Sequence, residues 1–179
     1  MHRCKLLLAM VCLLGPVTVI AADAPLSQGK VEDYIETRIE TKRLQDRMRA
    51  NADQYDDLVR AFYRKRAELL RARGWSPDGF DATQERIFRV QGQMERAPEL
   101  RERKRKDIAD LERLRESGQL EEERVENMIR QVKKDYAEEE AKIERTKPDW
   151  PAVRPCREEL EQLNDWVADN GAKPPEPEC

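Results

Sequence analysis

The sequence predicts an all-α protein, an elongated bundle in which a long N-terminal helix is followed by three to four shorter helices folded back along it. Three observations support this class. Charged residues make up 40% of the 179-residue chain. The larger apolar residues recur at steps of three, four or seven positions, which places them along one side of a helix. Prolines and glycines fall almost entirely between the proposed helices, and no stretch shows the alternation expected of a strand.

Residues 1–22 have the pattern of a cleaved export signal. Basic residues precede an apolar run over 6–14, a Gly-Pro pair interrupts it, and Ala21 and Ala22 offer cleavage sites. The alternative is an uncleaved membrane anchor, but the apolar run is shorter than the roughly 20 residues that a spanning helix needs. We therefore expect a periplasmic or secreted protein with no stable membrane insertion after signal cleavage. Cleavage would also remove His2, the only histidine.

The longest predicted helix runs from Val31 to Arg73, a stretch without proline or glycine. Gly74 can adopt the left-handed conformation that ends a helix, with Trp75 then packing on Leu70 in a Schellman motif. The apolar stripe lapses at Ala50–Asp53, where Asn and Asp side chains compete with helical hydrogen bonds. A break or bend at that point is therefore the alternative to a continuous helix.

Three further helices are predicted before the C-terminal segment. The second begins at Asp81, whose side chain would cap it, and ends before Pro98. Pro98 then occupies the first turn of a third helix, which stops at Ser117-Gly118. A fourth helix covers about 120–146, with three glutamates in its first turn. The predicted organisation is a signal peptide 1–22, a polar lead-in 23–30, a helical hairpin or bundle domain 31–147 and a C-terminal segment 148–179.

The C-terminal segment is predicted to be held by a disulfide. Three prolines within 147–155 argue against helix there, and a short helix then follows over 157–168. Cys156 and Cys179 are the only cysteines left after export, and an oxidising compartment favours their pairing. The Pro-rich tail can reach back from the end of the short helix to Cys156. The alternative is that Cys179 pairs with another chain.

The sequence does not contain the residues that catalysis or metal binding usually needs. With His2 in the signal, the mature chain has no imidazole to act as a base or a ligand. Asn51, Asp53, Asp56 and Asp57 lack the spacing and the glycine of a calcium loop. We therefore predict no catalytic residues, no metal site, no cofactor and no enzymatic activity.

Two groups of side chains are candidate interaction sites. Aromatic residues near the first turn would form an exposed partner-binding tip, or alternatively pack the end of the hairpin. A basic run would contact an anionic surface, or alternatively form a solvated helix face balanced by neighbouring acids. Nucleic acid is not expected, because the chain has a net charge of −3 and no aromatics within the basic run. The tip comprises Phe62, Trp75, Phe80 and Phe88, and the basic run contains Arg101, Arg103, Lys104, Arg105 and Lys106.

One short stretch resembles a known family. The local signature of the periplasmic Spy/CpxP group is Leu-Thr-x-x-Gln at the start of a helix. The segment Phe80-Asp81-Ala82-Thr83-Gln84 keeps the apolar residue, a capping residue and the glutamine. Combined with export, high charge and the absence of histidine, it resembles this group of helical chaperones and adaptors. The resemblance implies a helical protein that acts on other proteins, and it carries over no functional residue.

These observations predict a non-enzymatic exported helical protein that acts through protein–protein contact, as an adaptor, assembly factor or chaperone. The expected partner is another envelope protein or a second copy of the chain. Two alternatives stay open at this point. One is a cell-envelope hydrolase or hydrolase modulator that uses carboxylates alone. The other is a structural coiled-coil dimer, which a native molecular weight would distinguish.

Overall fold

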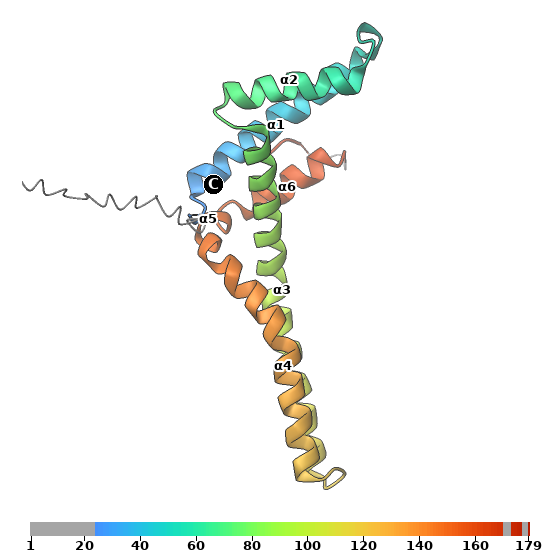
Figure 1. Cartoon of the computed structure of the whole chain (residues 1–179), viewed down its shortest axis with the longest axis vertical. Coiled ribbons are helices and arrows are strands. Elements are labelled where there is room, and N and C mark those ends of the chain that lie inside the picture. Colours follow the sequence, from blue (N-terminus) through green and yellow to red (C-terminus); the bar gives the residue numbers. More distant parts are fainter. Residues whose placement is uncertain (1–23, 170–172, 177–178) are drawn as a thin grey trace, which may run out of the picture.

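The computed structural model describes residues 24–169, 173–176 and 179, and within these residues every regular element is a helix (Figure 1). The predicted all-α class is confirmed. The predicted signal peptide lies outside the described residues. No helix in the described part of the chain is long and apolar enough to cross a membrane. The elements are α1 Gln28–Ala50, η1 Ala52–Gln54, α2 Leu58–Ala72, α3 Pro77–Glu116, α4 Glu122–Thr146, η2 Lys147–Asp149, α5 Trp150–Val153 and α6 Arg157–Val167.

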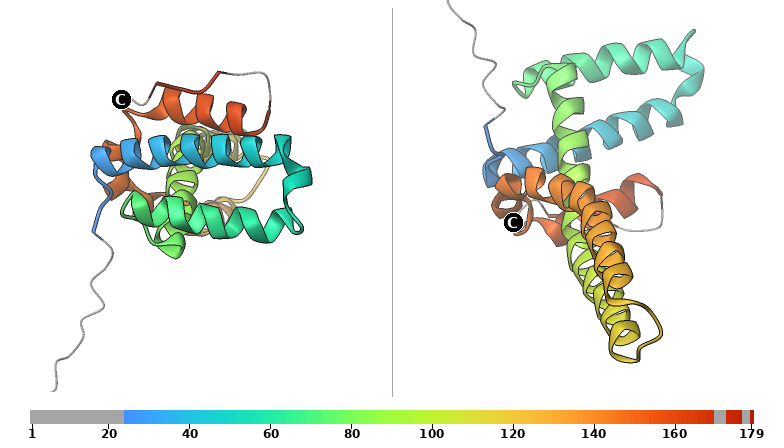
Figure 2. Two further views of the ribbon diagram at one scale, coloured as in Figure 1. Left: turned by 90° about the horizontal axis from the view of Figure 1, so that it is seen from above. Right: turned by 60° about the horizontal axis from the view of Figure 1, so that its bottom comes forward.

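The predicted helix over 31–73 is divided into α1 and α2, which corrects the expectation of one continuous helix. The break begins within the predicted weak stretch and extends to Asp57. At its start Asn51 donates a side-chain hydrogen bond to the carbonyl of Arg47 at 2.7 Å. Asp57 then caps α2 by accepting from the amide of Arg60. The two helices lie side by side and antiparallel (Figure 2). A continuous helix would be about 64 Å long, whereas the break lets α2 fold back and pack against α1.

The end of α2 is the Schellman motif that the sequence predicted. Gly74 has a φ of +79°, and its amide donates to the carbonyl of Arg71 at 3.0 Å. The amide of Trp75 donates to the carbonyl of Leu70 at 2.8 Å. Both Trp75 and Leu70 are buried in the core. The motif therefore ends α2 and also places the ring of Trp75 in the core.

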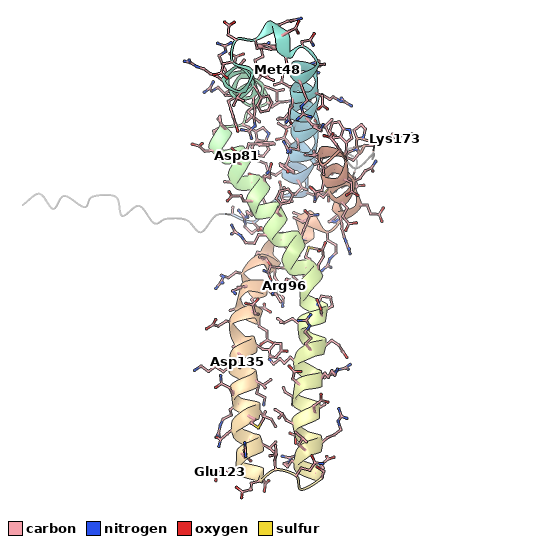
Figure 3. All side chains as sticks on the ribbon, turned by 90° about the vertical axis from the view of Figure 1, so that its right-hand side faces the viewer. Met48, Asp81, Arg96, Glu123, Asp135 and Lys173 are labelled. Carbon is pink, nitrogen blue, oxygen red and sulfur yellow. A yellow bond between two sulfur atoms is a disulfide. The ribbon has the colours of Figure 1, made fainter. Side chains whose placement is uncertain are left out.

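The longest helix is α3, and it corrects two predictions. It begins at Pro77 and is capped by Ser76, whose hydroxyl accepts from the amide of Gly79, so Asp81 is not the cap. It also continues through Pro98, which was predicted to start a new helix. A proline inside a helix removes one backbone hydrogen bond. Here α4 packs along α3 on both sides of that position, and this packing keeps the helix continuous (Figure 3).

α3 and α4 form a long antiparallel pair that extends beyond the rest of the molecule (Figure 1). Its turn follows the predicted stop, with Gly118 at a φ of +67°. We call residues 98–140 the arm. Two polar contacts join its helices: Tyr136 donates to Asp107 at 2.7 Å, and Lys104 lies 2.7 Å from Glu140. The remaining helices and the first part of α3 form a second region, the body.

The body has one apolar core to which α1, α2, α3, α5 and α6 all contribute. The segment 147–155, predicted to be non-helical, forms η2 and α5. This correction has a local cause, because Pro148 and Pro151 each occupy a first-turn position that needs no amide hydrogen. Trp150 and Trp166 are partly buried and pack against this core. Its buried members are Val31, Tyr34, Ile35, Ile39, Leu70, Trp75, Phe80, Ile87, Val90, Ala152, Val153, Cys156, Leu160 and Leu163.

Candidate functional site

The predicted aromatic tip does not form. Trp75 and Phe80 are buried and pack edge to face in the core, with ring centroids 5.2 Å apart. Phe62 is half-buried on α2, and Phe88 is exposed on α3. For Trp75 and Phe80 the alternative of core packing is therefore correct, because an aromatic ring gains more free energy in the interior than on the surface.

The predicted basic run is spread around α3 rather than gathered on one surface. Arg103 pairs with Glu99, and Arg105 pairs with Glu102 at 2.6 Å. Lys104 pairs across the arm with Glu140. Arg101 and Lys106, the other two members, are exposed. This arrangement matches the alternative of a solvated helix face balanced by acidic neighbours.

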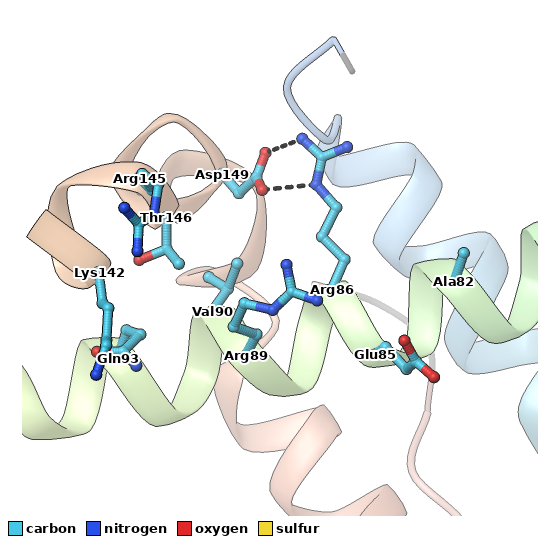
Figure 4. A pocket seen from close by; sticks show the side chains of 10 residues that line it. All are labelled: Ala82, Glu85, Arg86, Arg89, Val90, Gln93, Lys142, Arg145, Thr146 and Asp149. Atoms are coloured by element: carbon cyan, nitrogen blue, oxygen red, sulfur yellow. Dashed lines mark hydrogen bonds and ion pairs between the residues drawn. The ribbon is translucent and has the colours of Figure 1, made fainter. Parts of the chain in front are cut away.

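Four basic side chains converge elsewhere, on a crevice between α3, the end of α4 and η2. We call this cavity of about 770 Å³ the cationic crevice. Arg86 and Arg89 project from α3, and Lys142 and Arg145 come from α4 (Figure 4). Only two of the lining residues are acidic, so the crevice is locally positive on a chain that is acidic overall. It is lined by Ala82, Glu85, Arg86, Arg89, Val90, Gln93, Lys142, Arg145, Thr146 and Asp149.

One wall of the crevice is a bidentate ion pair. The guanidinium of Arg86 donates from Nε to one carboxylate oxygen of Asp149 at 2.7 Å and from Nη2 to the other at 2.8 Å (Figure 4). Asp149 is buried and also accepts from the backbone amide of Leu26, while Arg86 donates to the carbonyl of Ala24. This pair joins the N-terminal segment, α3 and η2, and it balances the charge of Asp149.

The other cations of the crevice are less well balanced. Arg89 and Arg145 are exposed, and neither makes an ion pair with any residue that the structure describes. Lys142 is paired with Glu139 on its own helix. Glu85, on the same helix as Arg89, is the one lining carboxylate outside the Arg86–Asp149 pair. Two guanidinium groups from different helices therefore line one cavity, and neither is paired with a carboxylate of the described residues.

The sequence contains a signal for this crevice at helical spacing. Arg86 and Arg89 are three residues apart, as are Lys142 and Arg145, so each pair lies on one face of its helix. The two faces meet only because α4 returns antiparallel to α3. A search for short basic runs cannot detect this pattern, because the two pairs are more than fifty residues apart.

A second exposed feature is the apolar seam of the arm. Leu111 and Val125 are buried between the two helices, whereas Ile108 and Ile129 are only half-buried and Met128 remains 39% exposed. Two helices cover one side of each other's stripe, so a two-helix pair leaves the rest of its apolar surface toward solvent. No other described element packs against the outer part of the arm (Figure 3).

Cys156 and Cys179 lie at disulfide distance, with their Cα atoms 4.7 Å apart, as the sequence predicted. The end of the chain is also held by a hydrogen bond of 2.6 Å from Gln28 to the carbonyl of Cys179. Among the described residues, Glu32 gathers with these two cysteines as a possible three-ligand metal group. The two sulfurs bond to each other instead, so the arrangement is that of a structural cross-link.

Comparison of the chain with known protein families, with curated proteins and with solved structures finds no match. The proposed function therefore rests on the geometry and chemistry of the described residues.

Proposed function

We propose that this chain is an exported helical protein that acts through protein–protein contact, as an adaptor, assembly factor or chaperone. The observation that supports the proposal is the arm. It extends from the body, and its apolar seam is covered only in part by the described residues (Figure 1). The body supplies a disulfide-held core from which this helical pair projects.

The half-covered seam can gain free energy by burying its apolar side chains against a partner. An apolar side chain that leaves water on binding contributes about 25 cal/mol for each Å² of surface buried. A partner helix can lay its apolar face against the exposed side of the seam and contact Met128, Ile129 and Ile108. Charged residues flank the seam and keep the free protein soluble. Such a partly covered surface is suited to a partner that binds reversibly.

The same seam favours one alternative partner, a second copy of the chain. Two arms packed seam to seam would form a four-helix bundle, which covers each stripe more completely than a pair does. This is the coiled-coil dimer that the sequence left open. Native molecular weight separates the two cases, because the dimer doubles the mass without any other protein.

A site-specific cross-link tests the proposal. A photoreactive amino acid placed at Met128 should yield cross-links to an envelope protein when cells are irradiated. The matched control is the same amino acid at Lys133, an exposed position on α4 about 140° further round the helix. Capture at Met128 and not at Lys133 supports the proposal. Equal capture at both positions, or none at either, contradicts it, and a cross-link to a second copy establishes the dimer.

A further inference from the structure

We propose that the cationic crevice binds an acidic peptide segment of the partner protein. This inference rests on the proposed function and names the chemistry of a second contact, at the base of the arm. The crevice lies beside η2, where α4 meets the body, so a partner that follows the arm inward reaches it (Figure 4).

The first step is charge. Arg89 and Arg145 face the crevice without an ion pair in the described structure, and Lys142 adds a third cation. A guanidinium group presents a planar set of donors that matches a carboxylate in a bidentate pair. Because the two guanidinium groups come from different helices, they suit two carboxylates of one segment. The excess positive charge also favours the encounter with an acidic partner.

The second step is size. A cavity of about 770 Å³ lies within the range of roughly 300–1,000 Å³ for ligand pockets. A single phosphate or sulfate would fill only a small part of this volume. The lining also includes Val90, an apolar surface, and Gln93, whose amide makes no hydrogen bond to other described residues. A free amide can donate to a peptide carbonyl and accept from a peptide amide.

The third step is rigidity. Arg86 and Asp149 form a bidentate pair that is anchored to Leu26 and Ala24. The positions of α3 and η2 are therefore set before any ligand arrives. Pre-organisation of this kind lowers the entropy lost on binding. The acidic residues of a partner would enter a site whose walls are already in place.

The test measures binding of a fluorescent twelve-residue peptide of alternating glutamate and serine, with a glutamine and serine peptide as the uncharged probe. The double variant Arg89→Ala, Arg145→Ala should bind the acidic peptide about tenfold more weakly, because two charge-assisted pairs are lost. The matched control is Arg101→Ala, Arg124→Ala. It removes the same charge from exposed positions of the same two helices and should change the affinity less than about twofold.

A gain-of-affinity variant guards against loss through misfolding. Glu85→Gln removes the lining carboxylate that no ion pair in the described structure balances, so it should tighten acidic-peptide binding by about twofold to fivefold. Equal weakening in both double variants would overturn the proposal, as would binding of the uncharged peptide with the same affinity. Competition by inorganic phosphate or a sulfated glycan at lower concentration than the peptide would also overturn it, because the crevice would then select another class of anion.

The two proposals fail in different ways. If the cross-link at Met128 persists in the Arg89→Ala, Arg145→Ala variant and the acidic peptide does not bind, the crevice inference is wrong and the proposed function stands. If the acidic peptide binds as expected and no cross-link forms at Met128, the arm is not the contact surface and the proposed function is wrong.

Discussion

Two buried charged side chains connect segments that are distant in the sequence. Asp149 links η2 to α3 and to residues 24–26. Lys42 on α1 lies 2.7 Å from Asp46 and 2.8 Å from Asp169, which is the second residue after the end of α6. Hydrogen bonds to Asp169 and then to Asp46 raise the pKa of Lys42. A buried charge is costly unless it is paired, so each of these residues stabilises one relative position of the helices.

Asp149→Asn should lower the free energy of unfolding by about 3 kcal/mol, because it leaves the guanidinium of Arg86 without its carboxylate. Chemical denaturation followed by circular dichroism measures the change. The matched control is Glu144→Gln, which breaks an exposed pair with Lys147 and should change stability by less than about 0.5 kcal/mol. Similar losses in the two variants would show that burial of Asp149 is not the cause.

The stability of the fold should also fall at alkaline pH because of Tyr34. Burial raises the pKa of Tyr34 from 10.0 to about 12, opposed by Arg38 and assisted by Asp81. The folded pKa lies above the unfolded one, so this contribution is fully present below pH 10 and is lost as pH rises toward 12.

Denaturation curves at several pH values measure this effect. Between pH 10 and 12 the wild-type free energy of unfolding should fall by about 1.4 kcal/mol per pH unit more than that of Tyr34→Phe. The phenylalanine variant serves as the control, since other groups that titrate in this range are common to both proteins. Equal slopes would contradict the prediction.

At the scale of elements, α2 and α3 end where a glycine allows a reversal, whereas α3 continues through Pro98 where α4 packs against it. Gly74 and Gly118 both adopt positive φ, and in each case the following amide donates back to the helix. Pro98 marks the opposite case, since it lies inside α3 and the helix continues through it. A glycine therefore ends a helix where the chain must reverse. A proline does not end a helix where the residues on both sides of it pack on a neighbouring helix.

Two glycine substitutions should have opposite effects on stability. Gly74→Ala places a side chain at a φ of +79° and should lower the free energy of unfolding by about 1 kcal/mol. Gly92→Ala lies inside α3, where nothing is within 4 Å of an added Cβ, and should raise it by up to about 1 kcal/mol. Thermal melts of the two variants decide the signs, and a stabilising Gly74→Ala would contradict the Schellman stop.

At the scale of the whole molecule, the body contains the apolar core and the arm carries the surface proposed to bind a partner. The core cluster lies entirely in the body and draws on the beginning and the end of the described chain (Figure 2). The arm contributes Leu111 and Val125 as buried residues, but it leaves Ile108 and Ile129 half-buried and Met128 exposed. The most stable part of the protein is therefore separated from the surface proposed to meet a partner.

The disulfide should stabilise this body. Cys156 and Cys179 are separated by 23 positions, and closing a loop of that size contributes roughly 3 kcal/mol through the entropy of the unfolded chain. We expect Cys156→Ser, Cys179→Ser to lower the free energy of unfolding by about that amount while the protein remains monomeric. Non-reducing mass analysis of the wild type provides the control. Two alkylatable thiols, or a reducible dimer, would contradict an internal bond.

Features that depend on a few neighbouring residues could be predicted from the sequence alone. The stop at Gly74 with Trp75 packed on Leu70 follows from residues within one helical turn of each other. The start of the short helix at Arg157 is equally local. The pairing of Cys156 with Cys179 follows from counting, since no other cysteine remains after the predicted cleavage. In each case the short-range chemistry leaves few alternatives.

Other features could be determined only from the tertiary structure, because two local conformations of the segment differ little in free energy. The break after Ala50 and the continuity of α3 through Pro98 each depend on what packs against the segment. The cationic crevice depends on the antiparallel return of α4, which brings Arg145 opposite Arg89. Burial against a neighbouring element contributes more free energy than local propensity does. Contacts between distant residues therefore settled the arrangement of the helices and the position of the candidate site.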